Sequence, residues 1–247
     1  MRVGVSGGAP IAPAVIGLFL ALGLDIVQGY GMTETSPVVS TNTPDDNDPS
    51  TVGRPLPGVE VRIGENSELM VRGASVMQGY WNRPEETQKV LGPDGWLHTG
   101  DQAQIRDGRI VITGRIKDII VTSTGEKVPP ADMELAILAD PLFEQVMIVG
   151  EQRPFLSVLA VVQARGLKEL EAQVGPDQLA DVLLQRVNRT LSAFPSYGSP
   201  KAIWWTTEPW TIENTLLTPT LKLKRLNLEQ RFEKEIAAMY SRRPRGS

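Results

Sequence analysis

The sequence contains no cysteine and only one histidine, His98. It therefore forms no disulfide, builds no thiolate metal site and offers no cysteine nucleophile, a composition that suits a reducing cytoplasm. An excess of positive charge is also absent, because 25 Lys and Arg stand against 29 Asp and Glu and give a formal net charge of -4. Nucleic-acid binding normally needs a basic face, so we expect no nucleic-acid partner.

Long hydrophobic runs are missing as well. The most apolar stretch, Ala9–Leu24, is interrupted by Pro10 and Pro13 and is shorter than the roughly 20 residues that a membrane-spanning helix needs. We predict a buried helix here, followed by a strand at Leu24–Gln28. No repeat or low-complexity tract occurs, and the Arg-rich end, Ser241–Ser247, is expected to be a frayed tail. A chain of 247 residues has room for one large domain or two smaller ones.

The first half of the chain shows strand periodicity after a polar loop. Apolar and charged residues alternate, an Asp-Gly pair marks a hairpin turn, and a Pro-Glu-Glu run opens a helix. Residues 50–113 therefore predict a small twisted β subdomain, with strands at Val59–Ile63, Glu68–Arg72, Gln102–Arg106 and Arg109–Thr113 and a helix from Asn82 to Leu91.

The second half alternates strands with helices. Pro130 starts a predicted helix, and two apolar runs predict buried strands. Apolar residues at helical spacing predict two amphipathic helices. The result is a compact α+β unit with strands at Gln145–Val149 and Phe155–Gln163 and helices at Pro176–Phe194 and Leu226–Tyr240.

The most informative segment is Gly29–Thr35, read Gly-Tyr-Gly-Met-Thr-Glu-Thr, after an apolar run. Tyr30 can stack on a base, and Gly31 lets the backbone approach a ligand closely. Thr33 can donate to a phosphoryl oxygen, and Glu34 can offer a hard oxygen to Mg²⁺. For a single heptapeptide, a plain turn with a capping Thr and a solvated Glu is the favoured interpretation, and only the motifs further along the chain reverse that preference.

Three further motifs follow in order, at residues 95–101, 114–130 and 217–225. With the heptapeptide they resemble the signature of the adenylate-forming, or AMP-binding, superfamily, which includes acyl-CoA synthetases, luciferases and nonribosomal adenylation domains. The resemblance implies α/β and α+β structure: residues 1–114 as the C-terminal part of a large AMP-binding domain with a β-barrel-like subdomain, 115–118 as a hinge, and 119–247 as a small mobile C-terminal domain.

Two charged residues of the middle motifs receive roles through this resemblance. In the family, the Asp of Gly-Trp-x-x-Thr-Gly-Asp accepts hydrogen bonds from both ribose hydroxyls, which assigns that role to Asp101. Arg115 is expected at the ribose or phosphate, and Lys117 at the hinge. His98 lies in the same motif, and we interpret it as structural. Without the resemblance, these residues would predict only a turn and a charged strand.

The loop through Gly125 is expected to swing in for thioester formation, since a residue without Cβ lets a pantetheine arm lie along the backbone. In the family, the Lys of the near-terminal motif bridges the carboxylate substrate and the α-phosphate, which assigns that role to Lys222. Lys224 and Arg225 are interpreted as a solvated face. The wording Leu-Thr-Pro-Thr-Leu-Lys-Leu-Lys-Arg resembles the long-chain fatty acyl-CoA synthetase branch.

Near the start, Gly7-Gly8-Ala9-Pro10 resembles the tetrapeptide that lines the family's adenine pocket, so Gly7, Gly8, Ala9 and Pro10 join the predicted nucleotide site. The family's phosphate-binding loop, rich in Ser, Thr and Gly and ending in Lys-Gly, does not occur in these residues. The chain is therefore expected to be a C-terminal portion that is inactive alone.

The resemblance implies a ligase that uses a medium- or long-chain fatty acid, ATP with Mg²⁺, and CoA. Two alternatives stay open: a ligase that loads an acyl carrier protein, and a non-catalytic nucleotide- or CoA-binding fragment. The compartment expected is the cytoplasm, with peripheral membrane contact as an open point. The oligomeric state and the fatty acid chain length are not determined by these residues.

Overall fold

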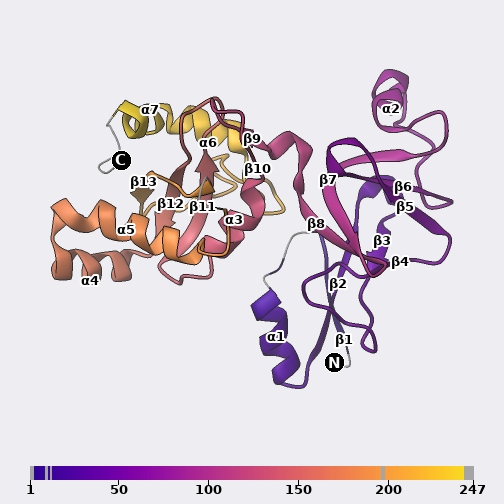
Figure 1. The fold of residues 1–247 in the computed structure, drawn as a ribbon, viewed down its shortest axis with the longest axis horizontal. Helices are drawn as coiled ribbons and strands as arrows, with labels where there is room; N and C mark the ends of the chain where they lie inside the picture. The colour runs from indigo at the N-terminus through magenta and orange to yellow at the C-terminus, as the bar shows by residue number, and fades with distance from the viewer. Residues whose placement is uncertain (1–2, 9–10, 12, 196–197, 242–247) are drawn as a thin grey trace. The chain divides into compact units, whose positions relative to one another are not determined.

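The computed structural model describes residues 3–8, 11, 13–195 and 198–241 (Figure 1). They fall into two compact units, Met1–Asp118 and Ile119–Ser247. The candidate residues Ala9 and Pro10, and the predicted tail beyond Ser241, lie outside the described residues. The first unit ends with a 3₁₀ turn at Ile116–Asp118, and the hinge assigned to residues 115–118 stays a prediction.

The first unit begins with a small mixed sheet in the order β1-β2-β3-β4. Strands β1 (Val3–Ser6) and β2 (Asp25–Gly31) are parallel and are joined by helix α1 (Pro13–Ala21). Strands β3 (Val38–Thr41) and β4 (Arg54–Pro55) continue the sheet in antiparallel pairs. The predicted helix followed by a strand is confirmed, and the parallel arrangement brings the carboxyl ends of β1 and β2 side by side.

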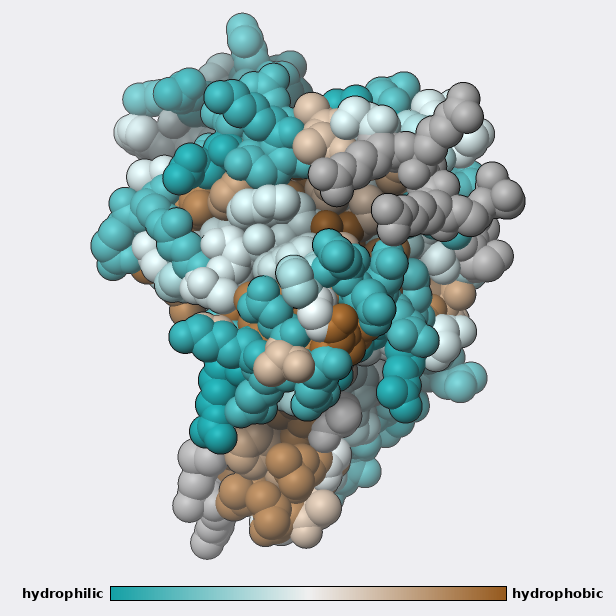
Figure 2. Space-filling view, turned by 90° about the vertical axis from the view of Figure 1, so that its left-hand side faces the viewer, coloured by the Kyte–Doolittle hydropathy of each residue, from teal (hydrophilic) through white to brown (hydrophobic). Residues whose placement is uncertain are grey.

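The predicted burial of this helix is wrong for most of its surface. Ile16 is fully buried, whereas Leu18 is 60% exposed and Leu22, just beyond the helix, is 67% exposed. Figure 2 shows hydrophobic side chains gathered at the bottom of the view, where α1 lies. The helix is apolar around its circumference, so one packed side leaves the others in solvent. No helix in the described part of the chain is long and apolar enough to cross a membrane.

A twisted antiparallel sheet in the order β5-β6-β7-β8 forms the rest of the first unit. Its hairpins are as predicted, including the Asp107-Gly108 turn with both residues at positive φ. The bounds are β5 Val59–Ile63, β6 Glu68–Gly73, α2 Pro84–Val90, β7 Leu97–Arg106 and β8 Arg109–Arg115.

A shared core joins the two sheets of the first unit. Val39 comes from the first sheet and Leu69 and Ile110 from the second, and all three are fully buried in one hydrophobic cluster. Backbone bonds reinforce the junction, since Val52 N donates to Ile110 O at 2.9 Å. The expected mixed α/β architecture with a curled β subdomain is confirmed.

The second unit is built on a three-stranded sheet in the order β11-β12-β13 (Figure 1). Strands β11 (Phe143–Val149) and β12 (Ser157–Val162) are antiparallel, and β13 (Ala202–Thr206) is parallel to β12. A short hairpin of β9 (Ile120–Val121) and β10 (Lys127–Val128) precedes the sheet.

Helices cover both faces of this sheet. Side chains on β11 alternate, so Val146 and Ile148 face a cluster with α3 and α5, while Met147 and Val149 face a cluster with α6 and α7. Strand β12 is buried on both faces along its whole length. The helix bounds are α3 Pro130–Ile137, α4 Ala164–Val174, α5 Pro176–Thr190, α6 Arg225–Arg231 and α7 Glu233–Ser241.

The prediction of one continuous helix at the end of the second unit is wrong. The segment Leu226–Tyr240 forms two helices that meet at Phe232, whose φ of -112° and ψ of 25° interrupt the helical path. The Phe232 ring packs against Trp204 and Trp210, with centroids 4.7 and 6.3 Å away. The aromatic cluster thus accompanies a break that the apolar spacing alone does not reveal.

Candidate functional site

The central feature of the first unit is a buried carboxylate with two donors. Tyr30 Oη donates to Asp101 Oδ2 at 2.6 Å, and Arg115 Nε donates to Asp101 Oδ1 at 2.8 Å. Asp101 is only 6% exposed, whereas the Arg115 side chain is 58% exposed. Residues from three of the four motifs therefore meet at one carboxylate.

Sheet register explains this meeting. Asp101 on β7 and Arg115 at the end of β8 are directly paired across the ladder, so their side chains share one face. Thr99 supports the strand, because its hydroxyl donates to Leu69 O at 2.7 Å and accepts from Asp101 N at 3.1 Å. The carboxylate is thus fixed by backbone structure before any ligand binds.

Burial and charge agree with this arrangement. Burial raises the pKa of Tyr30 well above its usual value, and the adjacent Asp101 raises it further, so the phenol stays a donor. The hydrogen bond to Asp101 raises the pKa of Arg115, which keeps the guanidinium charged. A carboxylate has about four acceptor positions, and two remain for a ligand's hydroxyl groups.

The turn after β2 is stabilised within the protein. Thr35 Oγ1 lies 2.9 Å from Met32 O and 2.8 Å from Pro37 O, which closes the turn at Thr33–Thr35. A Cβ on Gly31 would stand 1.8 Å from Pro37 O. The structure therefore explains Gly31 by a close approach of the chain to itself, a reason different from the predicted approach of a ligand.

Glu34 has a tyrosine partner that the sequence motifs did not indicate. Tyr80 Oη donates to Glu34 Oε1 at 2.7 Å, and this bond raises the pKa of Tyr80 to about 12. Thr33, beside it, is exposed. No group of three or more metal-ligating side chains occurs among the described residues. A single carboxylate still fits Mg²⁺, which commonly binds one or two carboxylates together with substrate phosphates and water.

Gly7 and Gly8 follow β1 directly, where the two parallel strands end. A Cβ on Gly7 would lie 3.4 Å from Gly29 O, so the predicted adenine loop borders the segment that carries Tyr30. Gly8 has a φ of +81°, a conformation that favours glycine. The first unit therefore gathers Gly7, Tyr30 and Asp101 at neighbouring positions in the fold.

The remaining candidates lie at the end of the first unit and in the second. Lys117 is an exposed residue of the turn at Ile116–Asp118. Gly125 occupies the turn between β9 and β10 at a φ of +85°, with open space where a Cβ would stand. Lys222 is exposed near the tip of a tight hairpin, where its backbone oxygen accepts from Thr218 N at 2.8 Å.

Two further residues of the motifs, Arg225 and His98, have side-chain partners within the protein. The interpretation of Arg225 as a solvated charge is wrong, because its side chain is 22% exposed and Nη2 donates to Glu134 Oε2 at 2.6 Å. This pairing spans 91 positions, and no local pattern signals it. His98 Nδ1 lies 2.8 Å from Glu68 Oε2.

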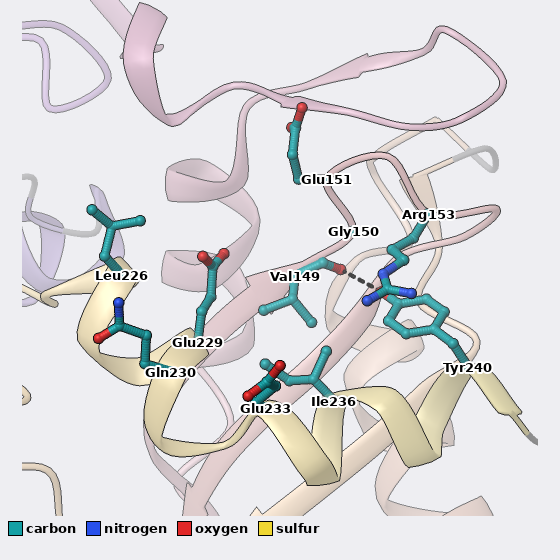
Figure 3. Close-up of a pocket in the computed structure, with 10 residues that line it drawn as sticks. All are labelled: Val149, Gly150, Glu151, Arg153, Leu226, Glu229, Gln230, Glu233, Ile236 and Tyr240. Atoms are coloured by element: carbon teal, nitrogen blue, oxygen red, sulfur yellow. Dashed lines mark hydrogen bonds between the residues drawn. The ribbon is translucent and has the colours of Figure 1, made fainter.

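The second unit also has a surface hollow of about 440 Å³, shown in Figure 3. Tyr240 Oη donates to Val149 O at 3.1 Å at one side, and the Arg153 guanidinium lies 4.9 Å from the centre of the Tyr240 ring. Three glutamates line the hollow, from the β11–β12 turn and from α6 and α7. None of the predicted site residues that the structure describes lines it.

The fold and the residues gathered in the first unit are typical of an α/β enzyme that binds a polar ligand beyond the carboxyl ends of parallel strands. The chain belongs to the AMP-binding enzymes. The family description "AMP-binding enzyme" matches residues 1–81, and "AMP-binding enzyme C-terminal domain" matches residues 117–244. The predicted family membership is confirmed.

Curated relatives include fatty-acid ligases. The long-chain-fatty-acid–CoA ligase FadD15 of Mycobacterium bovis is 35% identical over 257 residues, which cover 98% of this chain and 42% of the relative. Human long-chain-fatty-acid–CoA ligase 6 is 32% identical, with 98% and 38% covered. The chloroplastic long-chain-fatty-acid–acyl-carrier-protein ligase AEE15 of Arabidopsis thaliana is 32% identical, with 97% and 36% covered. The chain spans about two fifths of the length of these relatives.

Solved structures match over nearly the whole chain. The A domain of carboxylic acid reductase from Segniliparus rugosus, in complex with AMP and a co-purified carboxylic acid, aligns with a TM-score of 0.80 and 26% identity. This match covers 97% of this chain and 39% of that structure. An ATP-bound chimera, RpMatB-BxBclM B1, aligns with a TM-score of 0.76 and 26% identity over 94% of this chain and 46% of its own.

Proposed function

We propose that this chain forms the ribose-binding and C-terminal part of a fatty acid–CoA ligase, which activates a medium- or long-chain fatty acid with ATP and transfers it to CoA. The observation that carries the proposal is the buried Asp101 carboxylate with its donors Tyr30 and Arg115. Similarity to FadD15 and to human ligase 6 supports the substrate class.

The nucleotide would bind with its ribose at Asp101. Each carboxylate oxygen already accepts one donor and keeps one acceptor position, so the two hydroxyls of a ribose fit the remaining capacity. Gly7 and Gly8 would border the adenine, and Arg115 would contribute positive charge beside the ribose and phosphates. The related adenylation domain structure is in complex with AMP, which supports nucleotide binding by this fold.

In the first proposed step, a carboxylate oxygen of the fatty acid bonds to the α-phosphorus of ATP. The bond from that phosphorus to the bridging oxygen breaks, and pyrophosphate leaves with the electron pair. Glu34 would hold Mg²⁺, which neutralises phosphate charge, and Thr33 would donate to a phosphoryl oxygen. Lys222 would stabilise the charge that accumulates between the carboxylate and the phosphate.

In the second step, the CoA sulfur bonds to the acyl carbon, and AMP leaves with the electron pair of the broken bond. Gly125 would pass close to the pantetheine arm, because the space beside its Cα is open. Lys117, exposed near the end of the first unit, would serve as the pivot for a rotation of the second unit between the two steps.

Nucleotide binding by the chain itself is the direct test. Calorimetric titration with AMP is expected to give a measurable Kd, and Asp101→Asn is expected to weaken it about 10- to 100-fold, since hydrogen bonds to charged groups are worth about 1.5–3 kcal/mol. Asp94→Asn is the matched control, because Asp94 is exposed and its contacts with Arg62 and with Trp96 N are both long, at 3.4 Å. Equal affinities for AMP in both variants would contradict the ribose assignment.

Catalysis by the chain alone is not expected. No Ser/Thr/Gly-rich run ending in Lys-Gly occurs in the sequence, so ATP phosphates lack the loop that holds them in the family. Fatty-acid-dependent exchange of pyrophosphate into ATP should therefore stay at the level of a protein-free control. Robust exchange by the purified chain would refute this expectation and leave the AMP-binding result unaffected.

The second candidate function transfers the acyl group to a carrier protein. Similarity to AEE15, at 32% identity over nearly the whole chain, favours this alternative. With a full-length enzyme carrying this segment and a supplied acyl-AMP, consumption of the adenylate by CoA supports the first candidate. Consumption only by the phosphopantetheine thiol of a carrier protein supports the second.

A further inference from the structure

The hairpin that carries Lys222 is closely tied to itself. Lys222 N donates to the side-chain oxygen Thr218 Oγ1 at 3.0 Å, while Leu221 N donates to Thr218 O at 2.8 Å. Leu217 and Leu223 form a bridge at the base. The exposed Lys222 side chain therefore projects from a tip whose direction depends on how the base is anchored.

Arg225 lies three residues after Lys222 and begins α6. Its Nη2 donates to Glu134 Oε2 on α3, and Glu134 Oε1 accepts from Ile148 N on β11 at 2.7 Å. The side chains of Arg225 and Glu134 are 22% and 10% exposed. One largely buried ion pair therefore links the base of the hairpin to a helix and to a sheet strand.

We propose that Arg225, acting through Glu134, is a positioning residue that sets the place and direction of the Lys222 hairpin. Three residues of extended chain reach only about 10 Å, so an anchor at Arg225 restricts where Lys222 can go. Removing one partner of a buried pair leaves the other charge uncompensated, which favours local rearrangement of the segment that carries it. The functional meaning of this anchor rests on the proposed role of Lys222, whereas the anchor itself does not.

The same unit provides a matched control. Arg186 on α5 donates to both oxygens of Asp140, at 2.8 and 2.7 Å, and the two side chains are 41% and 12% exposed. This pair also joins an Arg to a largely buried carboxylate, but it lies far along the chain from Lys222. A general loss of stability would follow from breaking either pair, and only the Arg225 pair should affect the hairpin.

The test is amide hydrogen exchange of the full chain, followed by mass spectrometry of peptides within residues 214–224. In Arg225→Met, exchange at Leu221, Lys222 and Lys224, whose amides are hydrogen-bonded in the hairpin, should rise at least tenfold. Arg225→Lys, which keeps the charge, should restore part of the protection. Arg186→Met should leave this segment within about twofold of the parent.

A second readout follows the amine itself. The rate at which an amine-acylating reagent modifies Lys222, measured relative to exposed Lys234 in the same molecule, should change at least threefold in Arg225→Met and stay constant in Arg186→Met. If Arg225→Met fails to fold, Glu134→Gln provides the same comparison, since its amide oxygen still accepts from Ile148 N.

Unchanged exchange and labelling in Arg225→Met, or equal changes in Arg186→Met, would overturn the proposal. These measurements contain no nucleotide, fatty acid or CoA. Failure of the proposed ligase function would therefore appear in the AMP titration and leave the hairpin result intact, and failure of the anchor would leave AMP binding intact.

Discussion

Two tyrosine–carboxylate hydrogen bonds of similar length allow the effect of burial to be measured. Tyr30 donates to Asp101 at 2.6 Å, and Tyr80 donates to Glu34 at 2.7 Å. The first carboxylate is buried, while the second pair is accessible to solvent. Replacing each Tyr by Phe removes one hydroxyl and keeps the ring, so the two variants differ chiefly in the environment of the acceptor that loses its donor.

The expected cost differs because water can replace only one of the lost donors. Tyr30→Phe leaves a buried carboxylate short of a partner and should lower the unfolding free energy of the first unit by about 1.5–3 kcal/mol at pH 7. Tyr80→Phe should lower it by less than about 0.5 kcal/mol, because Glu34 is only half-buried and water can replace the lost donor.

The pH dependence has a defined sign. The pKa of Tyr30 is raised in the folded protein above the value of about 10 that it has when unfolded, so the unfolded state loses its proton first. The stabilisation is fully present below pH 10 and is lost as the pH rises from there through the folded pKa. The stability difference between the parent and Tyr30→Phe should accordingly shrink above pH 10.

At neutral pH the assay is hydrogen exchange of the backbone amides in β7 and β8, which belong to the first unit. Under conditions where the exchange rate reports the equilibrium between closed and open states, it gives the unfolding free energy of that unit. Above pH 10 a urea titration followed by far-UV circular dichroism replaces it, because amides then exchange too fast. An equal loss of stability in the two Phe variants would refute the argument from burial.

Five other substitutions test separate features of the fold and of the proposed site. Leu18→Lys should change the unfolding free energy by less than about 0.5 kcal/mol, whereas Ile16→Ala should lower it by about 2–5 kcal/mol. Urea titration measures both values, and equal losses would show that the outer face of α1 is covered in solution. Gly31→Ala should destabilise the first unit by at least about 1–3 kcal/mol, and Gly125→Ala, with open space at its Cβ, should cost only about 1 kcal/mol of backbone strain, as followed by thermal unfolding. In a full-length enzyme carrying this segment, Lys222→Ala should lower adenylation at least 100-fold and leave thioester formation from supplied acyl-AMP within about threefold; equal loss in both half-reactions would contradict the assigned role.

The sequence predicts the elements whose signals are local. Alternating residues in Val59–Ile63 and the Asp107-Gly108 turn mark hairpins that the structure contains. Strand β13 and helix α4 were not predicted. The segment Ala202–Thr206 becomes a strand because it pairs with β12, and that pairing is specified by residues distant in the chain.

In the candidate site, too, local sequence patterns predict some residues, while contacts between distant residues determine others. The motif resemblance indicates Asp101 and Arg115, and the register of β7 and β8 explains why they meet. The partnerships of Tyr80 and Arg225 could not be predicted, because each joins residues tens of positions apart through side-chain geometry. Arg225 in particular sits in a charged run, a pattern that usually indicates solvent, until Glu134 is placed opposite it.

The parallel pairing of β12 with β13 has a consequence for the order in which the second unit forms during synthesis. Residues 163–201 must be made before β13 exists, so β12 has only one hydrogen-bonded neighbour while that segment leaves the ribosome. Closing a loop of this length delays the contact, and the apolar strand stays open to wrong partners meanwhile. A nascent chain stopped before residue 202 should therefore depend on a holding chaperone, and one that extends past α7 should not.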